Sequence, residues 1–464
     1  MGLADEPPAN RARRSRRLDR TQSPLDNMAA MKQFLAICAM ASLPAIAGET
    51  WPQWRGPNLN GTSDGTQLPV SWSTTENVVW RTRLPSWAAA TPIIWKDTVF
   101  VTSAEEGSSL NRPNSQLFDG GDEGRDRLYL IAINRATGAV RWRQSMGRGN
   151  RIGNKQNMAS PSPVTDGEHV WVANGNGELR CFDFSGRQVW MRDFQADYGK
   201  FGVQFGYASS PVLLDGVLYL QNLQGMYTDD PSYVLAIDAA SGKTIWKVDR
   251  PTDGRHETPD SYSTATLAEV GEETVLIVSG AGYVTGHSLE TGKEIWRAGG
   301  LNPDDARNYR TIASSLVVGE IVLVPSRRRP FIAFRTDGKG DVTESKRLWS
   351  TDYGPDVPTP TSDGERLYII DDRGIALSLR VSDGSTVWDR TRIEPGTYSA
   401  SPLLADGKIY AISEEGTTSV LKAGDEFEIL AVNRLDDYTL ASPAEAGNQL
   451  FIRTATYLYC IGKP

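Results

Sequence analysis

A short pattern that recurs along the chain restricts its fold more than any other feature of the sequence. The stretch YSASPLLADGKIYAI at 398–412 contains an apolar run, an Asp-Gly pair and a second apolar run. Asp-Gly favours a tight hairpin turn because glycine adopts the positive φ that such a turn requires. Each copy therefore predicts one β-hairpin. Eight copies are expected, at 90–102, 159–173, 209–221, 263–279, 312–326, 358–370, 400–412 and 441–453.

A second pattern follows most of these hairpins and ends in tryptophan. It has the form of AIDAASGKTIW at 236–246, in which a glycine stands four residues before the tryptophan. We interpret it as a second hairpin whose outer strand ends in an indole that wedges between neighbouring units, burying a large apolar ring. This structural role is assigned to Trp80, Trp142, Trp190, Trp246, Trp296, Trp349 and Trp388.

Four strands per unit and a period of about 40–60 residues are typical of a β-propeller blade. The predicted fold is therefore all-β, an eight-bladed propeller of four-stranded antiparallel blades spanning 76–464. The last hairpin is followed by a single further strand at 456–462, whereas 77–85 carries Trp80 without a blade of its own. We therefore expect the N-terminal strand to complete the eighth blade, which closes the ring and removes an exposed sheet edge.

The first part of the chain is interpreted separately from the propeller. Residues 1–47 are expected to be an N-terminal extension and a signal peptide, because 31–49 has a basic start, an apolar stretch and a small-x-small pattern ending at Ala47. Cleavage is expected after Ala47, with 48–75 as a lead segment. The apolar stretch is too short to span a membrane, so the expected location is the periplasm or the outside of the cell.

Charge and composition exclude several classes of site. The net charge of −8 argues against a nucleic-acid partner. Three His and three Cys are few for 464 residues, and no His pair has metal-ligand spacing. Cys181 and Cys460 fall in strands of non-adjacent blades, so two free, buried thiols are expected. The glycine-rich stretch 280–286 lies between two strands with no following helix and is interpreted as a hairpin turn.

The segments that join successive blades are the first candidate site. They converge at one mouth of the central channel and carry aromatic and polar side chains suited to a ligand or a protein partner. The alternative is that the aromatic rings only pack between the ends of the blades. The candidate residues are Trp87, Asn157, Tyr207, Tyr262, Tyr309, Arg310, Asp356, Tyr398 and Tyr438.

Two further sites are suggested by local charge. Arg327, Arg328 and Arg329 are adjacent and could clamp an anion or an acidic partner, or form an exposed basic turn. The insertion 104–127 contains Asp119, Asp122 and Asp126, a weak calcium candidate whose spacing matches no complete calcium loop. A solvated acidic loop is the alternative, and no metal is expected elsewhere.

The repeat ending Ala-Ile-Asp-x-x-Ser-Gly-x-x-x-Trp resembles the tryptophan-docking repeat of the pyrroloquinoline-quinone (PQQ) propeller superfamily, over about 76–464. The lead WPQWRGPNLNG at 51–61 resembles secreted members labelled BamB-like. The resemblance implies either a non-catalytic scaffold or a quinoprotein dehydrogenase. The adjacent cysteines of the family's enzymes and the Cys-x-x-Cys-His haem motif are both absent from this sequence, so no catalytic residue is carried over.

The favoured expectation is an exported, non-catalytic propeller that binds a protein partner or small ligand at one face, with outer-membrane protein assembly as one such role. It needs no cofactor. The alternative is a PQQ- and calcium-dependent dehydrogenase of alcohols or sugars. That activity would need a carboxylate cluster at the channel mouth, for which Asp260, Asp304 and Asp356 are the nearest candidates.

Overall fold

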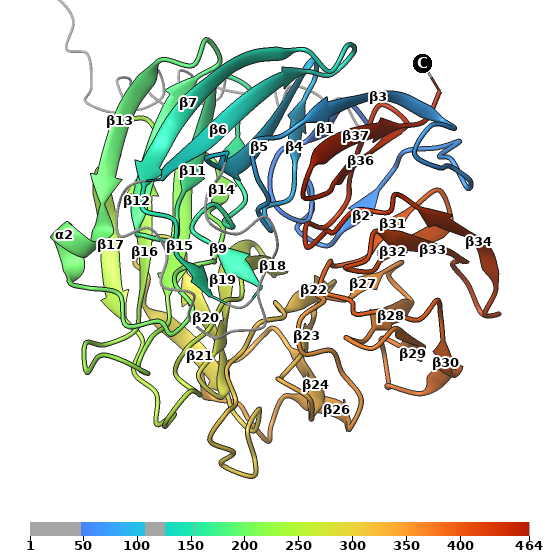
Figure 1. Cartoon of the computed structure of the whole chain (residues 1–464). Helices are drawn as coiled ribbons and strands as arrows, with labels where there is room; N and C mark the ends of the chain where they lie inside the picture. The colour runs from blue at the N-terminus through green and yellow to red at the C-terminus, as the bar shows by residue number, and fades with distance from the viewer. Residues whose placement is uncertain (1–47, 107–125, 154, 464) are drawn as a thin grey trace, which may run out of the picture. The chain divides into compact units, whose positions relative to one another are not determined.

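Eight small sheets surround a central channel in the computed structural model, which describes residues 48–106, 126–153 and 155–463 (Figure 1). The predicted eight-bladed propeller is confirmed. The expected signal peptide and two of the calcium candidates, Asp119 and Asp122, lie outside the described residues.

Blades 1 to 4 each run from an inner to an outer strand in chain order. Blade 1 has β4 (Ile93–Trp95), β5 (Thr98–Ala104), β6 (Arg127–Asn134) and β7 (Val140–Arg148). Blade 2 has β10 (Val164–Thr165), β11 (His169–Ala173), β12 (Glu178–Asp183) and β13 (Gln188–Asp193). Blade 3 has β14 (Val212–Leu214), β15 (Val217–Asn222), β16 (Tyr233–Asp238) and β17 (Thr244–Asp249). Blade 4 has β18 (Thr266–Val270), β19 (Glu273–Gly280), β20 (Tyr283–Ser288) and β21 (Glu294–Ala298).

Blades 5 to 7 repeat this order, and blade 8 takes its outer strand from the beginning of the propeller. Blade 5 has β22 (Leu316–Val318), β23 (Ile321–Val324), β24 (Phe331–Arg335) and β26 (Arg347–Thr351). Blade 6 has β27 (Thr361–Ser362), β28 (Arg366–Ile370), β29 (Ile375–Arg380) and β30 (Thr386–Arg392). Blade 7 has β31 (Leu403–Ala405), β32 (Lys408–Ile412), β33 (Thr417–Lys422) and β34 (Ile429–Arg434). Blade 8 has β35 (Ala444–Ala446), β36 (Gln449–Arg453), β37 (Tyr457–Ile461) and β3 (Val78–Arg83).

The closure of the ring follows the sequence prediction. Strand β3 pairs antiparallel with β37, with Val78 opposite Ile461 and Arg83 opposite Tyr457. The first and last propeller strands therefore belong to one sheet, and Figure 1 shows them side by side.

The Asp-Gly turns fall into two kinds. In blades 3 and 7 the pair is the whole two-residue turn, and both residues have positive φ, as at Asp215 (47°) and Gly216 (76°). In blades 2 and 6 the loop is longer and only the glycine has positive φ, as at Gly167 (95°). The tight two-residue turn predicted for all four pairs therefore occurs in two of them.

The outer tryptophans reach across the interface between blades. Trp190 of blade 2 donates its indole N–H to Ala239 O of blade 3 at 3.0 Å, and its ring lies against Gly242, where an added Cβ would come within 2.8 Å of it. Trp80, Trp142, Trp246 and Trp349 make the equivalent bond to the blade that follows. Trp296 and Trp388 are buried, but their indole N–H groups find no acceptor among the described residues.

A ring of hydrogen bonds joins the blades at the channel wall. Each bond runs from the backbone N–H of a Ser or Thr that lies just before an inner strand to the hydroxyl of its counterpart in the next blade, at 2.9–3.0 Å. We call the seven accepting residues the hydroxyl belt. They are Ser162, Ser210, Thr264, Ser314, Thr359, Ser401 and Ser442. The Ser/Thr hydroxyl of the recurring sequence pattern therefore has a structural function in seven blades, blades 2 to 8.

The lead segment runs along the inner strands. Strand β1 (Thr50–Trp51) pairs antiparallel with β4, and β2 (Thr62–Ser63) pairs in parallel with β31. Between them, the buried guanidinium of Arg55 donates to Pro402 O, Asn60 O and Pro360 O at 2.7, 2.8 and 2.5 Å. The lead segment thus ties blade 1 to blades 6 and 7.

Three short elements complete the described structure. Strand β25 (Gly340–Asp341) adds in parallel to the outer strand of blade 4. Strands β8 (Ile152–Gly153) and β9 (Gln156–Asn157) form a small hairpin between blades 1 and 2. Helix α2 (Phe194–Tyr198) follows blade 2, with its N-terminus capped by Asp193. No helix among the described residues is long and apolar enough to cross a membrane.

Candidate functional site

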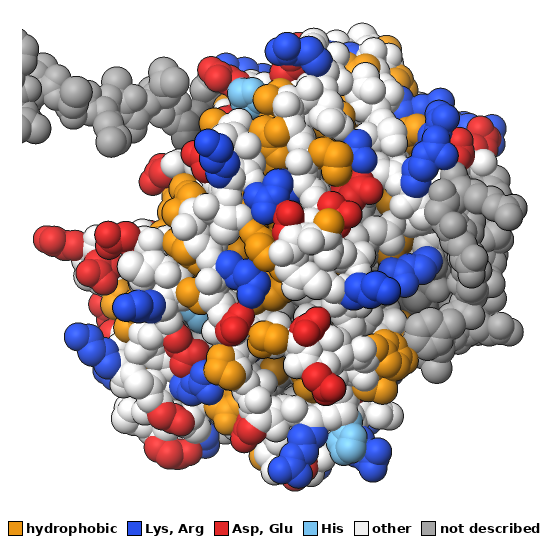
Figure 2. Space-filling model, turned by 90° about the vertical axis from the view of Figure 1, so that its left-hand side faces the viewer, with side chains coloured by type: hydrophobic (Ala, Val, Ile, Leu, Met, Phe, Trp, Pro, Cys, Tyr) orange, Lys and Arg blue, Asp and Glu red, His pale blue; other side chains and the backbone are white. Residues whose placement is uncertain are grey.

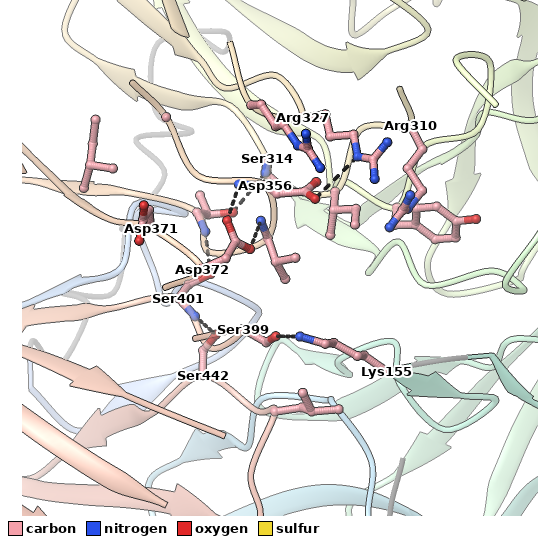
Figure 3. Close-up of a pocket in the computed structure, with 18 of the residues that line it drawn as sticks. Lys155, Arg310, Ser314, Arg327, Asp356, Asp371, Asp372, Ser399, Ser401 and Ser442 are labelled. Carbon is pink, nitrogen blue, oxygen red and sulfur yellow. Dashed lines mark hydrogen bonds and ion pairs between the residues drawn. The ribbon is translucent and has the colours of Figure 1, made fainter. Parts of the chain in front are cut away.

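A cavity of about 830 Å³ occupies the channel and is lined by residues from all eight blades. The hydroxyl belt forms part of its wall, and the half-buried Trp54 of the lead segment also lines it. The loops that join the second and third strands of blades 5 and 6 add charged side chains. Figure 3 shows several of these residues facing one another across the cavity.

The structure divides the candidate residues into two groups. Tyr262, Arg310, Asp356 and the arginines 327–329 line the cavity. The remaining six are not part of its wall; they are Trp87, Asn157, Tyr207, Tyr309, Tyr398 and Tyr438.

Three of these six pack between the ends of blades. Trp87 is buried against Leu440, with Tyr438 beside them. Tyr207 packs against Phe201, and their ring centroids are 5.4 Å apart. The positions of these rings therefore match the packing alternative given by the sequence.

The other residues of this group hold loops in place. Tyr398 is fully buried and donates its hydroxyl to Glu394 O at 2.7 Å. Asn157 donates its amide to Trp87 O at 2.8 Å, and the hydroxyl of Tyr309 bonds to Arg329 O.

The three adjacent arginines of blade 5 have different surroundings. Arg327 lies with its Nε 3.6 Å from Asp356 Oδ2, too far for a hydrogen bond, and this buried Nε has no other acceptor among the described residues. Arg329 pairs at 3.7 Å with Asp304, and both side chains are largely exposed. Arg328 is exposed at the cavity wall, and no described residue forms an ion pair or hydrogen bond with it. The cluster therefore keeps unused donor capacity.

Two more arginines lie over aromatic rings on the cavity wall. Arg310 pairs with Glu257 at 3.1 Å and lies 5.3 Å from the centroid of Phe205. The guanidinium of Arg390 lies 4.2 Å from the ring centroid of Tyr353. Such stacking fixes a cation in place while leaving its N–H groups available to a ligand.

Two carboxylates on the blade 6 side of the cavity, Asp356 and Asp372, are adjacent and half-buried. Asp372 accepts hydrogen bonds from the backbone N–H groups of Asp356 and Val357, at 2.7 and 3.0 Å. Burial, together with the neighbouring Asp372, raises the pKa of Asp356 to about 6. Burial likewise raises the pKa of Asp372.

Asp260 has a structural role and does not line the cavity. It accepts the backbone N–H groups of Gln204 and Met226 at 2.7 and 3.1 Å, which orders the loop that carries Phe205. Burial raises its pKa to about 6. Asp260, Asp304 and Asp356 therefore do not come together as one carboxylate cluster at the mouth.

A network that sequence reasoning missed joins opposite sides of the mouth. Lys155 Nζ donates to Glu414 Oε1 at 2.6 Å and to Ser399 Oγ at 3.3 Å, the second contact being drawn in Figure 3. Ser399 Oγ also donates to Glu414, and so does the hydroxyl of Tyr438, at 2.5 and 3.1 Å. Lys155 lies more than 240 positions from its partners, so no local pattern points to it.

The described residues offer no donor set for a metal ion. No group of three or more His, Cys, Asp or Glu among them could hold one. Asp126 is the sole described member of the calcium candidates. Cys181 and Cys460 are free and buried, as predicted, and burial raises the pKa of each thiol to about 12, so neither is a reactive thiolate at neutral pH.

Comparison with known proteins places this geometry in a family. The family described as "Outer membrane protein assembly factor BamB" matches residues 127–390, more than half of the chain. The chain belongs to this family. A BamB from Burkholderia pseudomallei (strain K96243) is 23% identical over 345 residues, which cover 59% of this chain and 85% of that protein.

Solved structures share the fold at low identity. The crystal structure of BamB from Moraxella catarrhalis aligns with a TM-score of 0.56 and 12% identity, covering 83% of this chain and 99% of that one. The quinohemoprotein alcohol dehydrogenase from Comamonas testosteroni aligns with a TM-score of 0.64 and 12% identity, covering 90% and 81%. At these identities the likeness shows the propeller fold alone.

Proposed function

We propose that the protein is an exported, non-catalytic scaffold of the BamB type, which binds a protein partner at the face where the cavity opens. The observation that supports this most is the family match, which spans six complete or partial blades of the propeller. The cavity face also carries exposed charged groups from several blades, including Arg328, Arg373 and Arg390. Rim charges of this kind set the rate and specificity of association.

The alternative of a PQQ- and calcium-dependent dehydrogenase is less well supported by the residues present. Within the described part of the chain, no three acidic or His/Cys side chains converge on one point. Both oxygens of Asp372 already accept backbone N–H groups. The donor set therefore does not fit calcium, and no catalytic step is derived for this group.

Site-specific photo-cross-linking in envelope fractions of the native organism tests the scaffold proposal. A cross-linking amino acid is placed at Arg373 or Tyr353 on the cavity face, and at Val189 on the exposed outer strand β13 as the matched control. The expected result is one defined protein partner captured from both cavity-face positions and not from Val189.

Two results would contradict the proposal. One is equal capture of the same proteins from all three positions. The other is reduction of a redox dye with alcohols or sugars after addition of PQQ and calcium, which would favour the dehydrogenase instead.

A further inference from the structure

The hydroxyl belt has hydrogen-bonding capacity that the fold does not use. Each of its seven oxygens accepts one backbone N–H from the preceding blade. No described residue accepts a hydrogen bond from any of the seven hydroxyls, although a Ser or Thr hydroxyl carries one donor. All seven side chains line the cavity and are only 2–8% exposed.

These hydroxyl donors converge on the channel because a Ser or Thr occupies the equivalent position in successive blades. Each oxygen accepts one N–H and keeps a second lone pair, whereas its O–H is donated to no described residue. Buried polar groups in proteins are nearly always paired with protein, water or a ligand. A ring of such O–H donors around one cavity is therefore suited to an occupant rich in hydrogen-bond acceptors.

Cationic groups add to this ring on the same cavity. The buried Nε of Arg327 forms an ion pair with Asp356 at 3.6 Å but has no acceptor within hydrogen-bond distance among the described residues, and Arg328 and Arg390 have no carboxylate partner there. Seven Lys or Arg side chains line the cavity against four Asp, in a chain whose net charge is −8. The cavity wall is therefore cationic although the protein as a whole is acidic.

The face of the molecule drawn in Figure 2 does not show the same arrangement. On the face in Figure 2, basic and acidic side chains alternate over short distances, with apolar side chains between them. Exposed pairs such as Arg83 with Glu106 neutralise one another locally.

We propose that the central cavity binds a small oxyanion, a molecule with a carboxylate, phosphate or sulfate group whose oxygens accept from hydroxyls of the belt and from Arg327 and Arg328. The volume of about 830 Å³ lies within the range of small-molecule sites. Aromatic rings of Trp54, Phe205 and Tyr262 also line it and supply apolar contact for the rest of such a molecule. This site shares Arg328 with the face assigned to the protein partner, but a small ligand inside the channel can bind without that partner.

Isothermal titration calorimetry of the full mature chain with citrate, phosphate and sulfate at constant ionic strength tests the proposal. Binding is expected at one site for at least one of the three, and the trimethyl ester of citrate, which lacks the charges, should not bind. Because a charge-assisted hydrogen bond contributes strongly, R327Q and R328Q should each weaken binding about tenfold. R83Q, on an exposed outer strand, should leave it unchanged.

The belt is tested by a pair of variants at one position. S401A removes a hydroxyl donor, but it also removes the acceptor of Thr359 N–H and could loosen the fold. S401T keeps both functions. Binding that is weakened in S401A and retained in S401T supports the site.

A crystal soaked in sodium selenate supplies a measurement independent of the variants. Anomalous signal is expected within the channel, beside Arg327 and the belt.

Three results would each overturn the proposal. They are selenate found only at outer-surface arginines, equal binding of the citrate ester, and R327Q and R328Q that bind like the parent. The absence of binding for all three anions at millimolar concentration would also overturn it. Loss of partner capture in the cross-linking experiment would not bear on it.

Discussion

At the level of single residues, the protein buries ionisable side chains that have no oppositely charged partner. His287 is 1% exposed, with Nδ1 2.9 Å from Gly292 O and Nε2 2.9 Å from Thr285 Oγ1. Arg250, beside it, donates only to neutral oxygens, among them Thr285 Oγ1 and Gly280 O. Such groups respond to pH through the cost of burying their charged forms.

His287 predicts that the folding stability of the protein falls at acidic pH. Burial lowers its pKa to about 4, below the value of about 6.5 in an unfolded chain. Between these two values the unfolded state binds the proton more tightly, so stability falls as pH falls from about 6.5 towards 4. Thermal unfolding from pH 7 to 4.5 should therefore show a steeper loss of Tm in the parent than in H287Q.

The raised pKa values of Asp260 and Asp356 have the opposite effect on stability over part of this range, but they are common to both proteins and cancel in the difference. Parallel Tm curves would contradict the prediction.

At the scale of the element, the blade interface depends on a glycine turn beneath each docked indole. Gly242 and Gly216 have similar positive φ values, 71° and 76°. An added Cβ would meet the ring of Trp190 at 2.8 Å at Gly242, but would meet nothing within 4 Å at Gly216. The two positions therefore separate backbone strain from loss of packing.

G216A is expected to cost about 1 kcal/mol, the strain of alanine in the left-handed region. G242A should cost clearly more, about 2–4 kcal/mol, because the indole must also move. Urea unfolding of both variants measures the difference. Equal losses would show that the indole contact adds nothing to the strain.

Truncation of one docked tryptophan tests the same interface through the indole instead of the glycine. Trp246 packs against Tyr219, with ring centroids 6.0 Å apart, and donates to Leu289 O at 2.8 Å. W246A is expected to lower the free energy of unfolding by about 3–5 kcal/mol, as for other large deletions in a core. Denaturant unfolding measures the loss, and W246F, which retains most of the ring, should recover the larger part of it. A loss below 1 kcal/mol would contradict the wedge role.

At the scale of the whole molecule, two devices hold the ring together. Strand β3 closes blade 8, and the lead segment joins inner strands on both sides of that closure. The hydrogen-bond ring runs from blade 1 to blade 8, but Thr91 Oγ1 has no partner among the described residues, so the eighth bond is missing at the closure itself. The lead segment reinforces the place where the ring of bonds is open.

A substitution at Arg55 tests whether the lead segment stabilises the closure of the ring. R55M leaves Pro360 O and Pro402 O without their donor, and each unsatisfied buried group costs about 1–3 kcal/mol. We therefore expect a lower Tm for R55M by differential scanning calorimetry. R83M, at an exposed pair with Glu106, is the control and should change stability by less than about 0.5 kcal/mol. If R55M has the same Tm as the parent, the lead segment does not reinforce the closure and strand β3 alone closes the ring.

The blade and its repetition follow from the sequence alone, because Asp-Gly turns, alternating apolar runs and glycine–tryptophan spacing act within one unit. The closure by 77–85 follows as well, since an unpaired strand at each end leaves one partner for the other. The position of the segments between blades also predicted Tyr262, Arg310 and Asp356 at the channel mouth, whereas the place of the blade 5 arginines on the cavity wall comes from the structure.

Which of the neighbouring side chains face the cavity is set by the path of each loop in the folded ring. Whether Tyr398 faces the channel or the gap between blades depends on the path of its loop, and the structure buries it. The hydroxyl belt depends on contacts between successive blades, 41–71 positions apart, and the Lys155–Glu414 pair joins segments 259 positions apart. Neither kind of contact lies within one hairpin, so no local pattern contains it.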